Sequence, residues 1–545
     1  MSDPSDTPSP APPPADAGEP SPTATRSAAN PAPRRRLPPP RRPAPRAAQR
    51  AEGEIPWLKP ALPLGGFLLF GAHLALGRAD FSLAHRALVA VPLIPLFWEA
   101  HRYHKVLRRL ELPMGVYALL IYYVTFSFSG FVSTTFYDVI GPVTFTDDAR
   151  LLGTAAVALG SIMIYLGFLA GERLGTRLQP LMIRVSPPAE VPDGFVRGAV
   201  WYSILCLATT QFLLTFSAMP PSISAIVSLT FSYAFGIGIT VAKPEAFRGP
   251  RSRYVGTALL FFGGVGGLLR GMLEPVIRLT ATTIAARWAF LRRFSRSFVI
   301  GAVAVYLIFQ PIKAEYRAQI WTTRGSADAA GYSERVNAWT TAFEHFWSGR
   351  DAGEDTQNAA VGRLVELDPI IHAFMLLPGR VQFAEGSGWL SILYAPIPRL
   401  LWANKPTTDD FEQHYSVVFN RQNSTGARST SILLPLIVDG YWNFGWPGIV
   451  FVTLAVGLWV GVCQKMYAVK HWAIQAMGVA QLSQLVITGS LAITYSGITQ
   501  GIIGPILSAW LVYLLARFLS VKQTFNAAGQ ANRLAALRMR RLSQR

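Results

Sequence analysis

Most residues that could carry chemistry lie in one polar interval, residues 313–448, which separates stretches of apolar sequence. Two phrases close this interval, IPRLLWANKP at 397–406 and DGYWNFGWPG at 439–448. Its arginines and lysines suit an anionic ligand, because guanidinium forks match phosphate oxygens in geometry and ammonium groups match them in charge. The candidate cations, two of which precede the interval, are Arg270, Arg278, Lys313, Arg317, Arg363, Arg380, Arg399 and Lys405.

Each cation also has a simpler explanation. Arg270 and Arg278 flank Glu274, so a salt bridge within one helix could let that helix enter a membrane. Lys313 and Arg317 lie one helical turn apart, where ordinary anchoring at a membrane interface would also place them. Taken together, however, these cations exceed what the positive-inside rule expects on an outer side, and they indicate a negatively charged ligand there.

Two residues are candidates for accepting a proton. His372 lies among apolar neighbours in a predicted helix, where a histidine either packs with a satisfied hydrogen bond or, as a neutral imidazole, takes a proton from a hydroxyl group. Asp439 precedes an aromatic turn and is either a base or a turn-starting aspartate before Gly440. Tyr441 and Asn443 of the same phrase could contact a sugar.

The composition defines a membrane protein. Hydrophobic residues make up 51% of the 545 residues and charged residues only 15%, with a positive mean hydropathy, whereas soluble domains average about 25% charged residues. The net charge of +19 sits mainly in short loops, which favours membrane topology over nucleic-acid binding. Cys206 and Cys463 fall in predicted spans and imply no metal or disulfide framework. No cofactor motif is present, and we expect neither a metal nor another cofactor.

Apolar runs of about 20 residues predict an all-α polytopic protein of about twelve transmembrane helices. Basic links between the early spans alternate with short or acidic ones, so both termini are expected in the cytoplasm. The glycine-rich stretch 255–290 is interpreted as two spans that meet near Arg270. The expected spans lie near 57–77, 86–100, 113–133, 151–171, 198–218, 222–242, 255–290 (two), 297–312, 448–466, 472–490 and 499–518.

The same pattern divides the chain into five parts. Residues 1–54 are rich in Pro and Arg and are expected to be a disordered cytoplasmic tail that contacts membrane lipids. Transmembrane helices 1–9 follow at 55–312, then a helical periplasmic cap at 313–447, helices 10–12 at 448–518, and a basic cytoplasmic tail at 519–545. Within the cap, 333–348 and 362–377 have helical character, with Pro369 marking a kink or a restart.

The order of these motifs resembles bacterial O-antigen and exopolysaccharide polymerases. The resemblance rests on KAEYR at 313–317, a Gly-Arg pair at 362–363, IPRLLWANKP, and an acidic residue before YWNFGWPG, and it covers residues 263–448. One departure is Asp439, since the family often carries a glutamate at that position. The first six spans agree with the family only in hydropathy.

The resemblance implies a glycosyltransferase of the bacterial inner membrane. Such an enzyme transfers a glycan from a polyprenyl diphosphate carrier to the sugar end of another lipid-linked repeat unit, alongside a flippase and a chain-length regulator. The alternatives are an O-antigen ligase-like enzyme, which differs in its acceptor, a metal-dependent multi-span glycosyltransferase, and a transporter of the same lipid-linked glycan. A transporter would bury charges along a path through the membrane centre.

Overall fold

The computed structural model describes most of the chain beyond the N-terminal tail. The N-terminal tail expected at 1–54 lies outside the described residues, and so does the expected C-terminal tail after residue 520. The described residues are 58–106, 111–131, 136–215, 227, 230–247, 254–269, 271, 273–291, 296–324, 330–348, 366–394, 397, 402, 408–424, 432–485, 489–495, 497 and 501–520.

The described residues form helices and no strands, which confirms the all-α prediction; two isolated bridges, Tyr137–Pro142 and Pro435–Gly489, are the β-type pairings among them. The helices are α1 (Leu58–Leu76), α2 (Leu83–Ala90), α3 (Leu93–Val106), α4 (Met114–Tyr122), α5 (Asp147–Val185), α6 (Phe195–Thr215), α8 (Tyr233–Ala242), α9 (Val255–Leu269), α10 (Glu274–Ala286), α11 (Arg296–Arg324), α12 (Tyr332–Ser348), α14 (Leu367–Leu376), α15 (Leu390–Tyr394), α16 (Thr408–Val418), α18 (Leu436–Met466), α19 (Trp472–Gln484) and a last helix, Gly501–Ser520.

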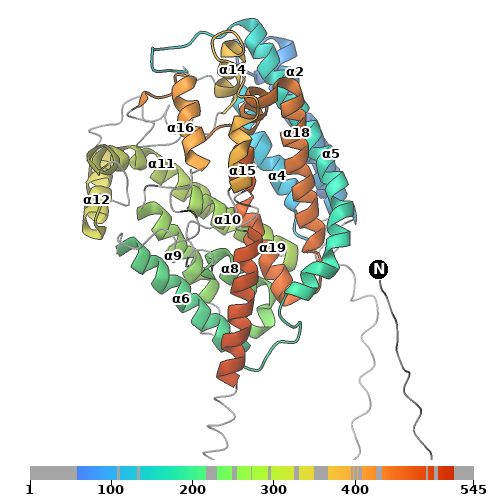
Figure 1. Cartoon of the computed structure of the whole chain (residues 1–545), viewed down its shortest axis with the longest axis vertical. Coiled ribbons are helices and arrows are strands. Elements are labelled where there is room, and N and C mark those ends of the chain that lie inside the picture. The colour runs from blue at the N-terminus through green and yellow to red at the C-terminus, as the bar shows by residue number, and fades with distance from the viewer. Residues whose placement is uncertain are drawn as a thin grey trace, which may run out of the picture. The chain divides into compact units, whose positions relative to one another are not determined.

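The long helices α5 and α18 lie side by side and pack against each other along much of their length (Figure 1). Glycines on both helices make this possible, since a Cβ at Gly171 would overlap the Leu458 carbonyl and one at Gly457 would overlap the Ile164 carbonyl. Small residues that let two backbones touch are typical of helix pairs in membranes, where dispersion contacts replace the hydrophobic effect.

Within the described ranges, five helical segments are long and apolar enough to cross a membrane: Leu83–Tyr103, Met114–Phe131, Asp147–Val185, Leu436–Met466 and Gly501–Ser520. The predicted count of about twelve spans is not confirmed. Several expected spans correspond to shorter helices, and α9, of 15 residues, rises only about 22 Å, against about 30 Å of hydrocarbon.

Two predicted regions correspond to short helices. Residues 472–483 of α19, which lies in the predicted span 472–490, are all buried inside the protein, Gln475 and Gln481 included. The stretch 255–290 does turn back on itself, as the sequence predicted. Helix α9 ends at Leu269, Gly271 adopts the left-handed conformation (φ +68°), and α10 begins at Glu274.

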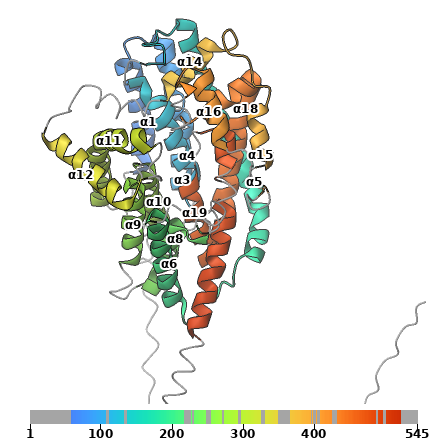
Figure 2. The ribbon, with the colours of Figure 1, turned by 60° about the vertical axis from the view of Figure 1, so that its left-hand side comes forward.

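The polar interval contributes α12, α14, α15 and α16. Figure 2 shows α14 and α16 toward the end of the bundle where α18 begins, whereas α12 lies to one side, next to α11. The predicted helix at 333–348 is α12, and Pro369 lies in the first turn of α14, where a proline is tolerated. The phrase DGYWNFGWPG lies within α18 and is helical except at Phe444 and Gly445, whose φ angles are −143° and 63°.

Candidate functional site

The turn between α9 and α10 is held by the KAEYR motif of α11. The Arg317 Nε donates to the Gly271 carbonyl at 3.0 Å, and the Tyr316 hydroxyl donates to the Leu269 carbonyl at 2.5 Å. A Cβ at Gly271 would lie 2.6 Å from the Tyr316 ring, so glycine is required for both its φ angle and this contact. The two carbonyls flanking Arg270 are therefore bound by residues 46 and 47 positions away.

The other cations of this region lie on the same helices. Lys313 is buried, with 8% of its surface exposed, one turn before Arg317 on α11. Arg278 is half-buried on α10 and lies within electrostatic reach of Tyr117 on α4. A second buried arginine that the sequence did not single out, Arg335 of α12, donates from Nε to the Ala330 carbonyl at 3.0 Å.

Asp439 is a buried hydrogen-bond acceptor that joins three segments. Its carboxylate accepts from the Asn443 Nδ2 at 2.9 Å, from the Leu491 backbone N–H at 2.7 Å, and from the Trp389 Nε1 at 3.3 Å to both oxygens. The side chain is 1% exposed. Asn443, the second predicted residue of this phrase, also donates to the Asp439 carbonyl at 2.8 Å.

Tyr441 of α18 and His372 of α14 contact different neighbours. Tyr441 stacks on Phe374 with ring centroids 4.0 Å apart, and His372, two residues earlier on α14, is 2% exposed. Burial, with the positive charge of Arg421, lowers the pKa of His372 to about 4, although Asp138 raises it. The His372 Nε2 lies 3.9 Å from the Asp138 Oδ2. Because burial outweighs the attraction of this carboxylate, the imidazole is neutral at physiological pH.

Arg421 is a cation beside His372 that sequence reasoning missed. Its guanidinium carbon lies 4.7 Å from the centroid of the Phe136 ring, and the His372 ring lies 5.1 Å from the same ring. Arg421 belongs to the polar interval, where a surplus of cations was already noted, but its sequence context, FNRQN, matches none of the motifs. Only the fold brings it to His372.

An ion-pair cluster at the same end of the bundle was also missed. Arg78 pairs with Asp368 at 2.6 Å and with Asp80 at 2.9 Å, and Arg150 lies 3.4 Å from Asp80. Burial opposes ionisation of Asp80, but the hydrogen bond and charge of Arg78 outweigh it and hold the pKa of this carboxyl below its usual value. The only sequence signal was a pair of opposite charges in the short GRAD link at 77–80.

A second charged network lies farther along α5. Arg102 pairs with Glu99 at 2.6 Å and with Glu172 at 2.8 Å, while Lys465 pairs with Glu111 at 2.9 Å and lies 3.4 Å from Glu172. Glu99 and Glu172 interrupt apolar runs, and that interruption was the available signal in the sequence.

The two networks mark the two boundaries of an apolar slab. Arg150 and Glu172 are 22 residues apart on α5, which corresponds to about 33 Å along a helix, close to the thickness of the hydrocarbon core. The buried ion pairs of these networks therefore lie at the two edges of the slab, and its centre on α5 is apolar.

The candidate residues thus fall into two groups. The first group lies at the start of α18, which contains Asp439, Tyr441 and Asn443 and contacts α14, the helix of His372. In the second group, Lys313 and Arg317 border the smaller hydrophobic cluster around Tyr316 and Trp339. Arg380 is exposed just after α14. The remaining candidates lie outside the described residues: Arg270, Arg363, Arg399 and Lys405. Across the described part of the chain, no group of three or more His, Cys, Asp or Glu side chains could hold a metal ion.

Comparison with known proteins places the chain in a family without an assigned function. It belongs to the family described as a domain of unknown function, DUF8712, whose model matches residues 198–520, more than half of the chain. No curated protein and no solved structure matches it. The matched region contains both the Gly271 turn and Asp439, while α1–α5 precede it.

Proposed function

We propose that this protein is a glycosyltransferase that polymerises lipid-linked oligosaccharide repeat units at the outer face of a bacterial inner membrane. The donor is a glycan on a polyprenyl diphosphate, and the acceptor is the sugar end of another lipid-linked repeat unit. The observation that carries the proposal is the binding of the Gly271 turn by Tyr316 and Arg317. This contact joins the KAEYR motif to the turn that contains Arg270, which supports the assignment of Arg270 and Arg317 to one anion site.

The chemistry requires stabilisation of a leaving diphosphate. The acceptor hydroxyl oxygen attacks the anomeric carbon, the bond from that carbon to the diphosphate oxygen breaks, and the hydroxyl proton passes to a base. Fixed cations stabilise the charge that develops on the diphosphate without needing to reorganise. Arg270, Arg317, Arg399 and Lys405 are the cations we assign to this role, each contact contributing about 1.5–3 kcal/mol.

His372 and Asp439 are the two candidates for the base. The His372 imidazole is neutral at physiological pH, but a pKa lowered to about 4 makes it a weak base, and Asp439 already accepts hydrogen bonds from three donors. We therefore assign Asp439 a positioning role. A diphosphate leaves readily and needs no general acid.

The charge distribution favours an enzyme over a transporter. A transporter of the same lipid-linked glycan would need polar groups along a path through the membrane centre. On α5, the ion-paired groups instead lie about 33 Å apart, at the two edges of an apolar stretch. A ligase-like enzyme would share the donor site and differ in its acceptor.

The proposal is tested with purified protein and a purified lipid-linked repeat unit. We expect chain growth by the native protein, with or without EDTA, and its loss in Arg270→Ala, Arg317→Ala and Arg399→Ala. Arg184→Ala, an exposed arginine at the other end of α5, is the matched control and should retain activity. No chain growth by the native protein would refute the polymerase function. Inhibition by EDTA would refute the metal-free mechanism, and transfer only to a lipid A core would identify a ligase.

A further inference from the structure

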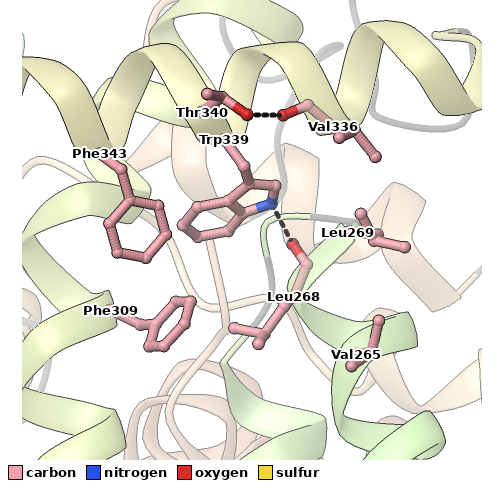
Figure 3. A pocket seen from close by; sticks show the side chains of 8 residues that line it. All are labelled: Val265, Leu268, Leu269, Phe309, Val336, Trp339, Thr340 and Phe343. Carbon is pink, nitrogen blue, oxygen red and sulfur yellow. Dashed lines mark hydrogen bonds between the residues drawn. The ribbon is translucent and has the colours of Figure 1, made fainter.

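A groove opens between α9, α11 and α12, beside the turn that Arg317 holds (Figure 3). Its volume is about 370 Å³. The three helices supply its walls, and the rings of Phe309, Trp339 and Phe343 lie close together on one side of it (Figure 3). The lining residues are Val265, Leu268, Leu269, Phe309, Val336, Trp339, Thr340 and Phe343.

The groove offers a hydrocarbon surface, because its few polar atoms are already satisfied. The Trp339 Nε1 donates to the Leu268 carbonyl at 2.8 Å, and the Thr340 hydroxyl donates to the Val336 carbonyl at 3.0 Å (Figure 3). The rings of Phe309 and Phe343 meet edge to face, with centroids 5.3 Å apart. A ligand in this groove gains from burying apolar area, and a sugar or a nucleotide would lose its hydrogen bonds to water.

The groove is accessible from outside the protein. Val336 and Thr340 are exposed, while Phe309 and Phe343 are half-buried. Covering this open apolar surface with hydrocarbon is favourable, by about 25 cal/mol per Å² of apolar area buried. The question is whether that hydrocarbon belongs to bulk lipid or to a particular amphiphile.

The charges beside the groove answer this question. Phe309, Lys313 and Arg317 follow one another at intervals of four residues on α11, so they lie along one stripe of the helix. Their positions rise by about 6 Å and 12 Å from the apolar end to the cationic end. Arg317 reaches the Gly271 carbonyl, two residues beyond the Leu269 that lines the groove. The polarity therefore changes along one line from hydrocarbon to cation, as it does along an anionic lipid.

We propose that this groove binds the hydrocarbon chain of a phosphate-headed isoprenoid lipid, next to its head group, and that the head group lies toward Lys313 and Arg317. The choice of an isoprenoid over a phospholipid chain rests on the proposed function. In that function the groove is the part of the donor site that holds the carrier lipid, and it sets the distance of the diphosphate from the Gly271 turn.

Photocrosslinking tests the site directly. The full chain, in nanodiscs of zwitterionic phospholipid, is irradiated with a polyprenyl diphosphate that carries a diazirine in the chain near the head group. Mass spectrometry should locate the label on peptides from α9, α11 and α12, and unlabelled undecaprenyl diphosphate should compete while phosphatidylglycerol should not. Labelling of other helices, or equal competition by phosphatidylglycerol, would overturn the assignment.

Groove-filling variants give the matched comparison. Val336→Trp should weaken labelling and raise the KM for the donor about tenfold, which corresponds to about 1.4 kcal/mol, while kcat changes little. Val303→Trp, at an exposed position of α11 that does not line the groove, should leave both unchanged. Thr340→Phe is the second filling variant if Val336→Trp does not fold. Equal labelling of a folded filling variant and the native protein would refute the inference.

The two proposals can fail separately. Labelling of the groove without any polymer formation would retain the lipid site and refute the glycosyltransferase. Polymer formation that is equally fast, with unchanged labelling, in both Val336→Trp and Val303→Trp would retain the enzyme and refute the groove as its lipid site.

Discussion

Replacement of Asp439 distinguishes two roles for its carboxylate, which is either a buried acceptor that clamps three segments together or a catalytic base. The carboxylate accepts from Asn443 at 2.9 Å, from the Leu491 backbone at 2.7 Å and from Trp389 at 3.3 Å, and it is 1% exposed. These donors come from α18, from the segment after α19, and from the turn before α15. Loss of the carboxylate would release all three segments together, so stability and activity should fall in parallel.

The size of the effect follows from the number of donors left without an acceptor. Each buried donor without a partner costs about 1–3 kcal/mol. The longer bond to Trp389 counts for less than the other two, so we expect Asp439→Ala to destabilise the protein by about 3–5 kcal/mol. In Asp439→Asn one carbonyl oxygen remains to accept from Leu491, while the new NH₂ group faces another donor, so we expect a smaller cost of about 1–3 kcal/mol. Trp389→Phe removes only the weakest bond and should cost about 1 kcal/mol.

Thermal unfolding with a thiol-reactive fluorophore measures these effects. Cys206 and Cys463 are both buried, so the dye reports the loss of tertiary structure in detergent. Asp193→Asn, at an exposed loop position, controls for the loss of one negative charge. The order of melting temperatures should be Asp193→Asn, then Asp439→Asn, then Asp439→Ala. An Asp439→Asn variant that melts with the native protein but makes no polymer would refute the clamp and establish Asp439 as the base.

Three further perturbations test the contact between α5 and α18, the ion pair of Arg78 with Asp368, and the lowered pKa of His372. Gly457→Leu should destabilise the α5–α18 pair by several kcal/mol, because its side chain would overlap the Ile164 carbonyl, and the thiol-dye melt would detect it; a native melting temperature would contradict the backbone contact. Arg78→Met should cost about 3–5 kcal/mol by leaving Asp368 buried without its partner, and adding Asp368→Leu should restore part of the loss; a double variant no more stable than Arg78→Met would argue against a direct pair. The pKa of His372 is lowered from 6.5 to about 4, so its contribution to stability is complete above pH 6.5 and is lost as the pH falls toward 4. As the pH falls across this range, the melting temperature of His372→Gln should fall less steeply than that of the native protein. Parallel curves for the two proteins would refute the lowered pKa of His372.

Several features of the molecule follow from local sequence alone. The apolar runs and the scarcity of charge favour helices that enter a membrane, since a continuous apolar run of about 20 residues satisfies its own backbone hydrogen bonds there as a helix. The helix at 332–348 and the reversal of the chain at Gly271 were also predictable. Four glycines at 263–267 before an arginine, a fifth glycine directly after it and a second apolar run leave few alternatives to a helical hairpin.

The span count and the pairing of charges depended on tertiary structure. Hydropathy does not distinguish a helix buried in protein from one that faces lipid, and residues 472–483 of α19, in the predicted span 472–490, are all buried. The roles of Asp439 and Arg78 were equally hidden, because their partners lie 50 or more residues away at Trp389, Leu491 and Asp368.

The cationic motifs illustrate the same division. The sequence alone determined that Lys313 and Arg317 share one face of a helix, because that follows from a four-residue interval. Only the tertiary structure decided that this face meets the Gly271 turn and continues into an apolar groove. Such a meeting depends on how α9, α11 and α12 pack, and packing joins side chains whose separation along the chain carries no periodic signal.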